Sequence, residues 1–251
     1  MFDIVVVNYH TPWDLQRFLE SARELTVDHT ITIMEVESSG EGVVMPRDGE
    51  RWLYASENIG YARACNRGAC VGDGELIGFF NADTILNDDA IIHALEVLVS
   101  SPDIAVVGPK QIDSKGRLTH AGIVGTNKRC IPRKFHSRDR GLYDVIESCV
   151  SVSGSAYLIK RDVWNEMADC PLYREADTGS VGAFLQTPHY YEETFLSYHV
   201  RAHGYEVVYD GLACIRHEWH QASPVGGWAE QQTKESRAIF ERACAAHGID
   251  C

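Results

Sequence analysis

The sequence has no long apolar run and no basic leader. None of its segments approaches the roughly 18 consecutive apolar residues that a membrane-spanning helix requires. Residues 1–8 form one short apolar run without preceding basic residues, which is typical of a first strand and not of a secretion signal. We therefore expect no transmembrane segment and a cytoplasmic protein.

Positive charge is scarce in this chain. Its 251 residues include 23 basic and 36 acidic residues, a net charge of −13, and such a field generally repels nucleic acids and anionic membranes. One segment, residues 127–141, reverses this balance with a single acidic residue, Asp139, and six basic ones: Lys128, Arg129, Arg133, Lys134, Arg138 and Arg140. This basic segment is either a solvated surface loop or the place where an anionic partner binds.

Metal-type cysteine spacing is also missing. The eight cysteines include no C-x-x-C pair, so we expect reduced thiols and no disulfide framework. The pairs His217/His220 and His199/His203 have spacings that occur in zinc sites, but neither has a second ligand pair at the matching distance along the chain. The sequence therefore does not predict a dedicated zinc site.

The first half of the chain alternates short apolar runs with amphipathic segments. Apolar residues make up 45% of the chain and charged residues 24%, values typical of a globular protein. The pattern predicts strands at residues 3–9, 30–36, 52–55, 76–80 and 104–108, and helices at residues 13–24, 61–70 and 88–100. This alternation predicts an α/β fold with a mostly parallel mixed central sheet flanked by helices, whose ligands bind at the carboxyl edge.

The second half is less regular. We expect strands at residues 150–160 and 206–209, and helices from residue 162, at 192–203 and at 228–247. No internal repeat, linker or low-complexity tract divides the chain, so residues 1–251 are expected to form a single domain.

Polar side chains stand at the expected strand ends. Asn8 and Tyr9 follow the first strand, Glu35 and Glu37 close the second, and Asn81 with Asp83 follow a later one, while Glu192, Glu193 and His217 come from the second half. Parallel strand ends meet at one crevice, where several carboxylates would repel one another unless a divalent cation neutralised them. Taken alone, Asp83 before Thr84 could equally be a helix cap.

Six short motifs in order carry a family resemblance over residues 3–223. They are Val5-Val6-Val7-Asn8-Tyr9, Asn58-Ile59-Gly60-Tyr61-Ala62-x3-Asn66-x-Gly68, Phe80-Asn81-Ala82-Asp83-Thr84, Val107-Gly108-Pro109-Lys110, Ser153-Gly154-Ser155-Ala156, and Tyr191-Glu192-Glu193 leading to His217. In these motifs the sequence resembles glycosyltransferase family 2, the inverting nucleotide-sugar enzymes of the GT-A fold, and within it the rhamnosyltransferase-like branch.

The resemblance implies a nucleotide-sugar-binding half at residues 1–110, an acceptor and catalytic half at 111–223, and a C-terminal helix within 224–251. In the first half, Asn8 and Tyr9 would hold the nucleobase, and Glu35, where the family usually has Asp, would accept a base N–H. Asn58 would border the nucleotide, and Arg63 would contact the diphosphate unless it is only a surface arginine.

The resemblance also implies a divalent cation, Mg²⁺ or Mn²⁺, that bridges the donor's phosphates. Asn81-x-Asp83 matches the family's D-x-D position with asparagine first, so Asp83 supplies the anionic ligand, and His217 matches a histidine that can join it. The general base would be Glu193, in register with the family's E-D pair, with Glu192 as the alternative. Phe195 stands where the family has a further Asp.

The acceptor side is implied to include Gly154 and the neighbouring basic segment, with Arg133 and Lys134 as candidate contacts. Six like charges within a short stretch repel one another unless they are solvated or face an anion. The acceptor hydroxyl would then belong to a phosphate-bearing molecule, such as a lipid-linked diphosphate sugar or a modified nucleic acid. If the segment is only solvated, a neutral glycan, a small molecule or a protein hydroxyl fits better.

Two other functions are compatible with parts of the pattern. A nucleotidyltransferase would share the acidic strand ends but needs a glycine-rich phosphate loop after the first strand, and residues 8–12 contain no glycine. A non-catalytic sugar-nucleotide or glycan-binding module on a GT-A fold would not need all of Asp83, Glu193 and His217, and their joint presence favours an enzyme.

Overall fold

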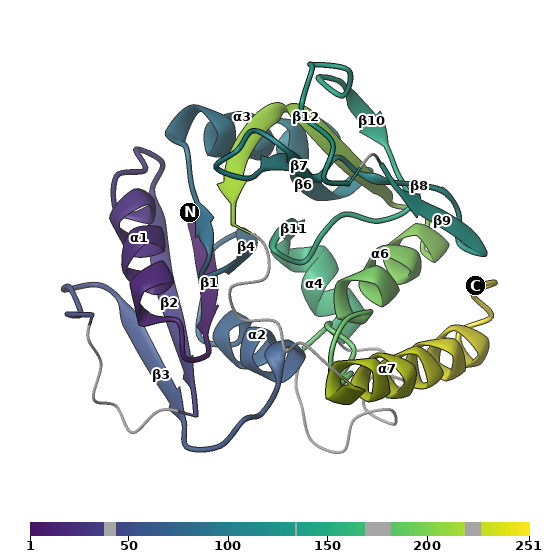
Figure 1. The fold of residues 1–251 in the computed structure, drawn as a ribbon, viewed down its shortest axis with the longest axis horizontal. Helices are drawn as coiled ribbons and strands as arrows, with labels where there is room; N and C mark the ends of the chain where they lie inside the picture. Colours follow the sequence, from purple (N-terminus) through teal and green to yellow (C-terminus); the bar gives the residue numbers. More distant parts are fainter. Residues whose placement is uncertain (38–43, 134, 169–181, 219–226) are drawn as a thin grey trace.

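The protein is described here by a computed structural model, which covers residues 1–37, 44–133, 135–168, 182–218 and 227–251. Helices lie on both faces of a ten-stranded mixed sheet (Figure 1). The strands of this sheet are β1 (Phe2–Asn8), β2 (His29–Val36), β3 (Arg51–Ala55), β4 (Leu76–Asn81), β5 (Thr84–Ile85), β6 (Ile104–Ile112), β7 (Leu118–His120), β10 (Ile146–Ser148), β11 (Ala156–Lys160) and β12 (Glu206–His217). A separate hairpin consists of β8 (Ile123–Thr126) and β9 (Arg129–Pro132).

The described helices are α1 (Pro12–Ala22), α2 (Tyr61–Ala69), α3 (Asp88–Val99), α4 (Arg161–Ala168), α6 (Glu192–Ala202) and α7 (Gly227–Ala246). Across the sheet the strand order is β10-β12-β6-β11-β4-β1-β2-β3, with β7 paired to β6 and β5 paired to β12. The pairs among β3, β2, β1 and β4 are parallel, whereas β11 runs antiparallel between β4 and β6. The predicted α/β class with a mostly parallel central sheet is confirmed.

The central strands are buried on both faces. Along β1, Ile4 and Val6 pack with residues of α1 and α3, whereas Val5 between them packs with residues of α2 and α6 on the opposite face. Gly68 allows α2 to approach this strand, because a Cβ there would lie 2.4 Å from Cγ1 of Val5. Burying one such aliphatic side chain contributes about 1.5–3 kcal/mol. The apolar runs that predicted strands are therefore apolar because helices cover both sides.

Two predicted strands of the second half have other bounds than expected, and the strands β7, β8, β9 and β10 were not predicted. The expected strand 150–160 begins only at Ala156, because residues 153–156 form a turn in which the Ala156 N–H donates to the Ser153 carbonyl. The expected strand 206–209 continues to His217 as β12. It does so through a bulge, where the Asp210 carboxylate accepts from the N–H groups of Leu212 and Ala213 and lets the strand resume.

No helix among the described residues is long and apolar enough to cross a membrane. Six of the cysteines form no disulfide: Cys65, Cys70, Cys149, Cys214, Cys244 and Cys251.

A buried carboxylate connects the two halves at the opposite end of β1 from the predicted site. Asp3 is 1% exposed, and its Oδ2 accepts from Nη2 of Arg161 at 2.6 Å and from the N–H of Gly74 at 2.7 Å. Its Oδ1 accepts from the hydroxyl of Thr30. The carboxylate is therefore fully paired inside the protein.

We expect Asp3→Ala to destabilise the fold by about 3–5 kcal/mol, because the substitution leaves the guanidinium of Arg161, whose side chain is 14% exposed, without its counter-charge. The measurement is the urea midpoint of unfolding by circular dichroism. Asp73→Ala, at an exposed carboxylate next to Gly74, is the control and should change stability by less than about 0.5 kcal/mol. Equal stability of the two variants would contradict the assignment.

Candidate active site

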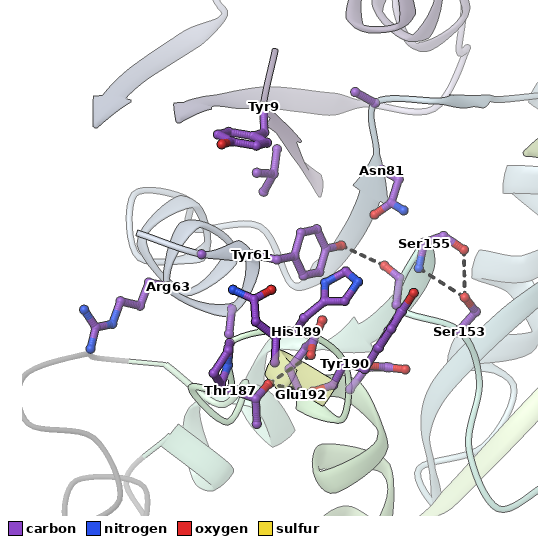
Figure 2. Close-up of a pocket in the computed structure, with 18 of the residues that line it drawn as sticks. Tyr9, Tyr61, Arg63, Asn81, Ser153, Ser155, Thr187, His189, Tyr190 and Glu192 are labelled. Atoms are coloured by element: carbon purple, nitrogen blue, oxygen red, sulfur yellow. Dashed lines mark hydrogen bonds between the residues drawn. The ribbon is translucent and has the colours of Figure 1, made fainter. Parts of the chain in front are cut away.

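A cavity of about 1150 Å³ opens at the carboxyl ends of β1 and β4 (Figure 2). Tyr9 and Asn81 line it from the first half of the chain, and Gly154, Glu193 and His217 line it from the second. The antiparallel strand β11 makes this meeting possible, because the N–H of Asn81 donates to the carbonyl of Ser155 at 3.1 Å just before β11 begins. The cavity is therefore formed jointly by the two predicted halves.

Three of the residues predicted to hold the nucleotide line this cavity: Tyr9, Asn58 and Arg63. A hydrogen bond to Glu37, with a smaller contribution from burial, raises the pKa of the Tyr9 phenol. The Asn58 side chain accepts from the N–H of Gly60 at 3.0 Å, where the chain enters α2. Nε of Arg63 donates to Oε1 of Gln186 at 2.5 Å and so connects α2 to the chain before α6.

Asn8 and Glu35 are not among the residues that line the described cavity. Nδ2 of Asn8 donates to both carboxylate oxygens of Glu35, at 3.2 and 3.0 Å, and Oδ1 of Asn8 accepts from the N–H and hydroxyl of Thr11. Burial raises the pKa of the Glu35 carboxyl. These hydrogen bonds connect the end of β2 to the start of α1. Direct contact of Asn8 and Glu35 with a nucleobase stays a prediction.

Asp83 and His217 come together from distant parts of the chain. Nε2 of His217 lies 3.4 Å from Oδ1 of Asp83, because the short strand β5 pairs with the end of β12 and sets Thr84 opposite His217. His217 is 3% exposed, and its Nδ1 atom is buried with no hydrogen-bond partner among the described residues. Asn81, the other member of the predicted motif, also lines the cavity.

Among the residues that the structure describes, no group of three or more His, Cys, Asp or Glu side chains is placed to hold a metal ion. Asp83 and His217 nevertheless offer one carboxylate and one imidazole beside an open cavity, and Mg²⁺ commonly takes only one or two protein carboxylates plus water and substrate phosphates. The two side chains therefore fit a cation that arrives with a phosphorylated ligand.

Glu192 and Glu193 lie in the first turn of α6 and both line the cavity. Glu192 is 7% exposed, and its Oε2 accepts from the hydroxyl of Thr187 at 3.1 Å. Burial raises the pKa of both carboxyls, and the charge of Glu193 raises that of Glu192 further. The N–H groups at the helix N-terminus and of Gly154 act in the opposite direction on Glu193. Glu193 is the more accessible of the two.

Gly154 packs directly on Glu193. A Cβ on Gly154 would lie 3.3 Å from Cγ of Glu193, so a larger residue would press on the Glu193 side chain. The carbonyl of Gly154 accepts from the hydroxyl of Tyr61 at 2.8 Å (Figure 2). On either side of it, the hydroxyls of Ser153 and Ser155 lie 2.8 Å apart and line the cavity.

Several cavity residues were given no role from the sequence: Tyr61, Thr119, His120, Ser153, Ser155, Thr187, His189 and Tyr190. Tyr61, Ser153 and Ser155 stand inside the family motifs but were given no role there, and no spacing rule singles out the others. His120 is an example: it is buried, and Nε2 accepts from the N–H groups of Gly122 and Ser153 at 3.3 and 3.4 Å. Burial lowers its pKa to about 3, so the ring is neutral.

Some side chains of the basic segment, residues 127–141, form ion pairs within the protein. The guanidinium of Arg133 bonds to Glu147 and lies 5.6 Å from the ring centroid of Tyr143, and Arg133 does not line the described cavity. Lys128 pairs with Asp250 at 2.7 Å. Lys134 lies outside the described residues. Contact of Arg133 and Lys134 with an acceptor therefore stays a prediction.

The family model described as "Glycosyltransferase like family 2" matches residues 2–238, nearly the whole chain. The chain belongs to glycosyltransferase family 2. No curated protein sequence matches it, and the rhamnosyltransferase-like branch stays a prediction.

Two solved structures of this glycosyltransferase fold are similar to the chain. One is mannosyltransferase PcManGT from Pyrobaculum calidifontis in complex with GDP-Man and Mn²⁺, with 15% identity and a TM-score of 0.61 over 97% of this chain and 64% of that one. The other is GalNAc-T7 with UDP, GalNAc and Mn²⁺, with 13% identity and a TM-score of 0.67 over 98% of this chain and 47% of that one. The chain thus spans less than two thirds of either protein, and the likeness shows the GT-A fold.

Proposed function

We propose that this chain transfers a hexosyl or deoxyhexosyl group from a nucleoside-diphosphate sugar to an acceptor hydroxyl with inversion at the anomeric carbon. The observation that carries the proposal is the convergence of Asp83, His217 and Glu193 on one cavity. Membership of glycosyltransferase family 2 supports it, as do the nucleotide and sugar ligands named for the two similar structures.

The donor side of the cavity suits a nucleotide diphosphate. The ring of Tyr9 is available to stack on a base, and Asn58 and Arg63 border the path to the Asp83–His217 pair. A Mg²⁺ or Mn²⁺ ion held by Asp83 and His217 would neutralise the diphosphate and stabilise the charge that develops on it as the leaving group. The protein's own part is to hold the diphosphate at this end of the cavity.

Glu193 is the proposed general base. An acceptor hydroxyl is far too weak an acid to ionise near neutral pH, so its proton must be accepted as its oxygen attacks the anomeric carbon. In a single displacement the new glycosidic bond forms while the bond to the diphosphate breaks, and the proton goes to a carboxylate oxygen of Glu193. Glu192 is less suitable, because it is more deeply buried and already accepts from Thr187. We assign Glu192 the role of positioning the first turn of α6.

The proposal is tested with a panel of nucleoside-diphosphate sugars, each mixed with the protein with and without MnCl₂. We expect one donor to raise the melting temperature in the presence of Mn²⁺, because a ligand at 100 times its Kd adds about 2.7 kcal/mol to stability. The same donor should be hydrolysed slowly when water replaces the acceptor. If no donor of the panel stabilises the protein or is hydrolysed, the proposal is wrong, and stabilisation without hydrolysis would indicate a binding module.

A further inference from the structure

We propose that Tyr61 is a positioning residue for the base Glu193, on which it acts through the backbone of Gly154. The inference rests on the proposed function and adds a residue to its machinery. Tyr61 is the first residue of α2, and its hydroxyl donates to the carbonyl of Gly154 at 2.8 Å. Gly154 lies against Glu193 in turn, since a Cβ on this glycine would be 3.3 Å from Cγ of Glu193. The two halves of the chain are thus joined at the base.

Both polar backbone groups of Gly154 are engaged. Its carbonyl accepts from Tyr61, and its N–H donates to the carboxylate of Glu193. Burial raises the pKa of Glu193, and the N–H of Gly154 opposes this shift because a donor favours the ionised carboxylate. Within the turn, the N–H of Ala156 donates to the carbonyl of Ser153 at 3.3 Å. The hydrogen bond from Tyr61 ties this turn to α2 and so fixes the direction of the Gly154 backbone.

The hydroxyl of Tyr61 is suited to a permanent donor role. Its ring packs against the hydrophobic core, and burial raises the pKa of the phenol well above its usual range. Cys65, one turn further along α2 and fully buried, hydrogen-bonds with the same hydroxyl, and burial raises the pKa of this thiol as well. Tyr61 therefore keeps its proton near neutral pH and donates it to the carbonyl of Gly154.

Tyr61 also lies beside the part of the cavity proposed to hold the donor. The two residues that lead into α2 are held by a hydrogen bond from the N–H of Gly60 to the side chain of Asn58, at 3.0 Å, and φ is 77° at Gly60. Figure 2 shows Tyr61 between Tyr9 and Glu192. A donor bound at this turn is therefore next to the residue that orients the base.

The titratable groups that face Glu193 come from three elements: Glu192 in α6, Tyr157 in β11, and Tyr61 and Cys65 in α2. Burial raises the pKa of both phenols and of the thiol, so these three groups are neutral near pH 7. The remaining group is a carboxyl, and none of the four is a cation. The ionised form of Glu193 is therefore stabilised by N–H donors, which include Gly154 and the first turn of α6.

The test is the ionisation of Glu193, measured by NMR titration of the protein labelled with ¹³C at the glutamate carboxyls, without donor or acceptor. Glu192→Gln is the background, so that Glu193 titrates alone and not as one of a pair, and the signal is identified by its loss on Glu193→Gln. We expect Tyr61→Phe to raise the pKa of Glu193 by up to about one unit, because the backbone of Gly154 is no longer fixed. In the transferase assay, the acid limb should rise equally and kcat at pH 7 should fall by up to about tenfold, while donor Kd stays within about twofold.

Tyr209→Phe is the matched control. It also removes a tyrosine hydroxyl that donates to a backbone carbonyl, that of Tyr143 at 3.0 Å, and Tyr209 is not among the residues that line the described cavity. This variant should lower the melting temperature to a similar extent and leave the pKa of Glu193 and the acid limb in place. The proposal is wrong if Tyr61→Phe shifts the pKa of Glu193 no more than Tyr209→Phe does.

A second measurement needs no variant of Tyr61. The amide ¹⁵N–¹H signal of Gly154 should move with the ionisation of Glu193 in the otherwise unchanged protein, because this N–H donates to the carboxylate. A Gly154 signal that does not follow this titration would also overturn the proposal, even if Tyr61→Phe failed to fold. A protein that gives both NMR results but transfers no sugar would retain the link between Tyr61 and Glu193 and reject the proposed function.

Discussion

Glu193→Gln is expected to lower the turnover number on the order of 10²- to 10⁴-fold, because glutamine keeps the shape of the side chain but cannot accept the acceptor's proton. Donor affinity should change little, since Glu193 lies against Gly154 and not among the residues proposed to hold the nucleotide. The measurement is kcat with saturating acceptor, together with the donor Kd by titration calorimetry.

The pH dependence of the activity distinguishes a general base from a residue with only a structural role. Burial raises the pKa of Glu193, so the acid limb of kcat/KM should lie above the usual carboxyl range near pH 4.3. Activity should fall as the pH falls through that limb, because a protonated carboxyl cannot act as base. Glu192→Gln is the matched control and should leave the limb in place. If Glu192→Gln shows the large loss and Glu193→Gln does not, the base is Glu192.

Asp83→Ala is expected to abolish the part of donor binding that depends on the divalent cation, a loss on the order of 10²-fold or more in the presence of Mn²⁺. Asp83 is the only carboxylate in the proposed ligand pair, and His217 alone cannot neutralise a cation that bridges two phosphates. The measurement is the donor-induced shift in melting temperature with MnCl₂ and with excess chelator. Chelator should reduce the shift of the unchanged protein to that of the variant.

The control for Asp83→Ala is again Asp73→Ala, at an exposed carboxylate outside the cavity lining, which should retain the full Mn²⁺-dependent shift. The variant should also keep its native circular dichroism. An Asp83→Ala protein that does not fold would indicate a structural role for this residue, although not that of a helix cap, because Asp83 precedes β5 and Asn87 caps α3. Donor binding that is equally strong in excess chelator, in the unchanged protein, would reject the metal-assisted proposal.

Much of the first half could be predicted because its signals are local. The strands β1 and β4 are short apolar runs bounded by polar residues, and the segments between them repeat apolar residues at helical spacing, so neighbouring residues alone indicate both element types. The place of the site at the carboxyl ends of β1 and β4 followed from the same reasoning. The second half was less predictable, because β7 and β10 have three residues each, too few for a periodic pattern to be distinguished.

The family motifs predicted more of the site residues than residue spacing alone could. They named Asp83, Glu193 and His217 together, and all three line one cavity. The 3.4 Å approach of His217 to Asp83, however, depends on the pairing of β5 with β12. Strand pairing between distant segments is set by the packing of the whole sheet, and no local signal in either segment specifies it.

By itself, then, the sequence determined the α/β class, the strands and helices of the first half and the types of polar group available for chemistry, since these depend on residues close together in the chain. The tertiary structure alone decided which of those groups face the cavity. Asn8 and Glu35 satisfy each other, and Arg133 is bound to Glu147, because a polar side chain that leaves bulk water pairs with whatever partner the fold brings within reach.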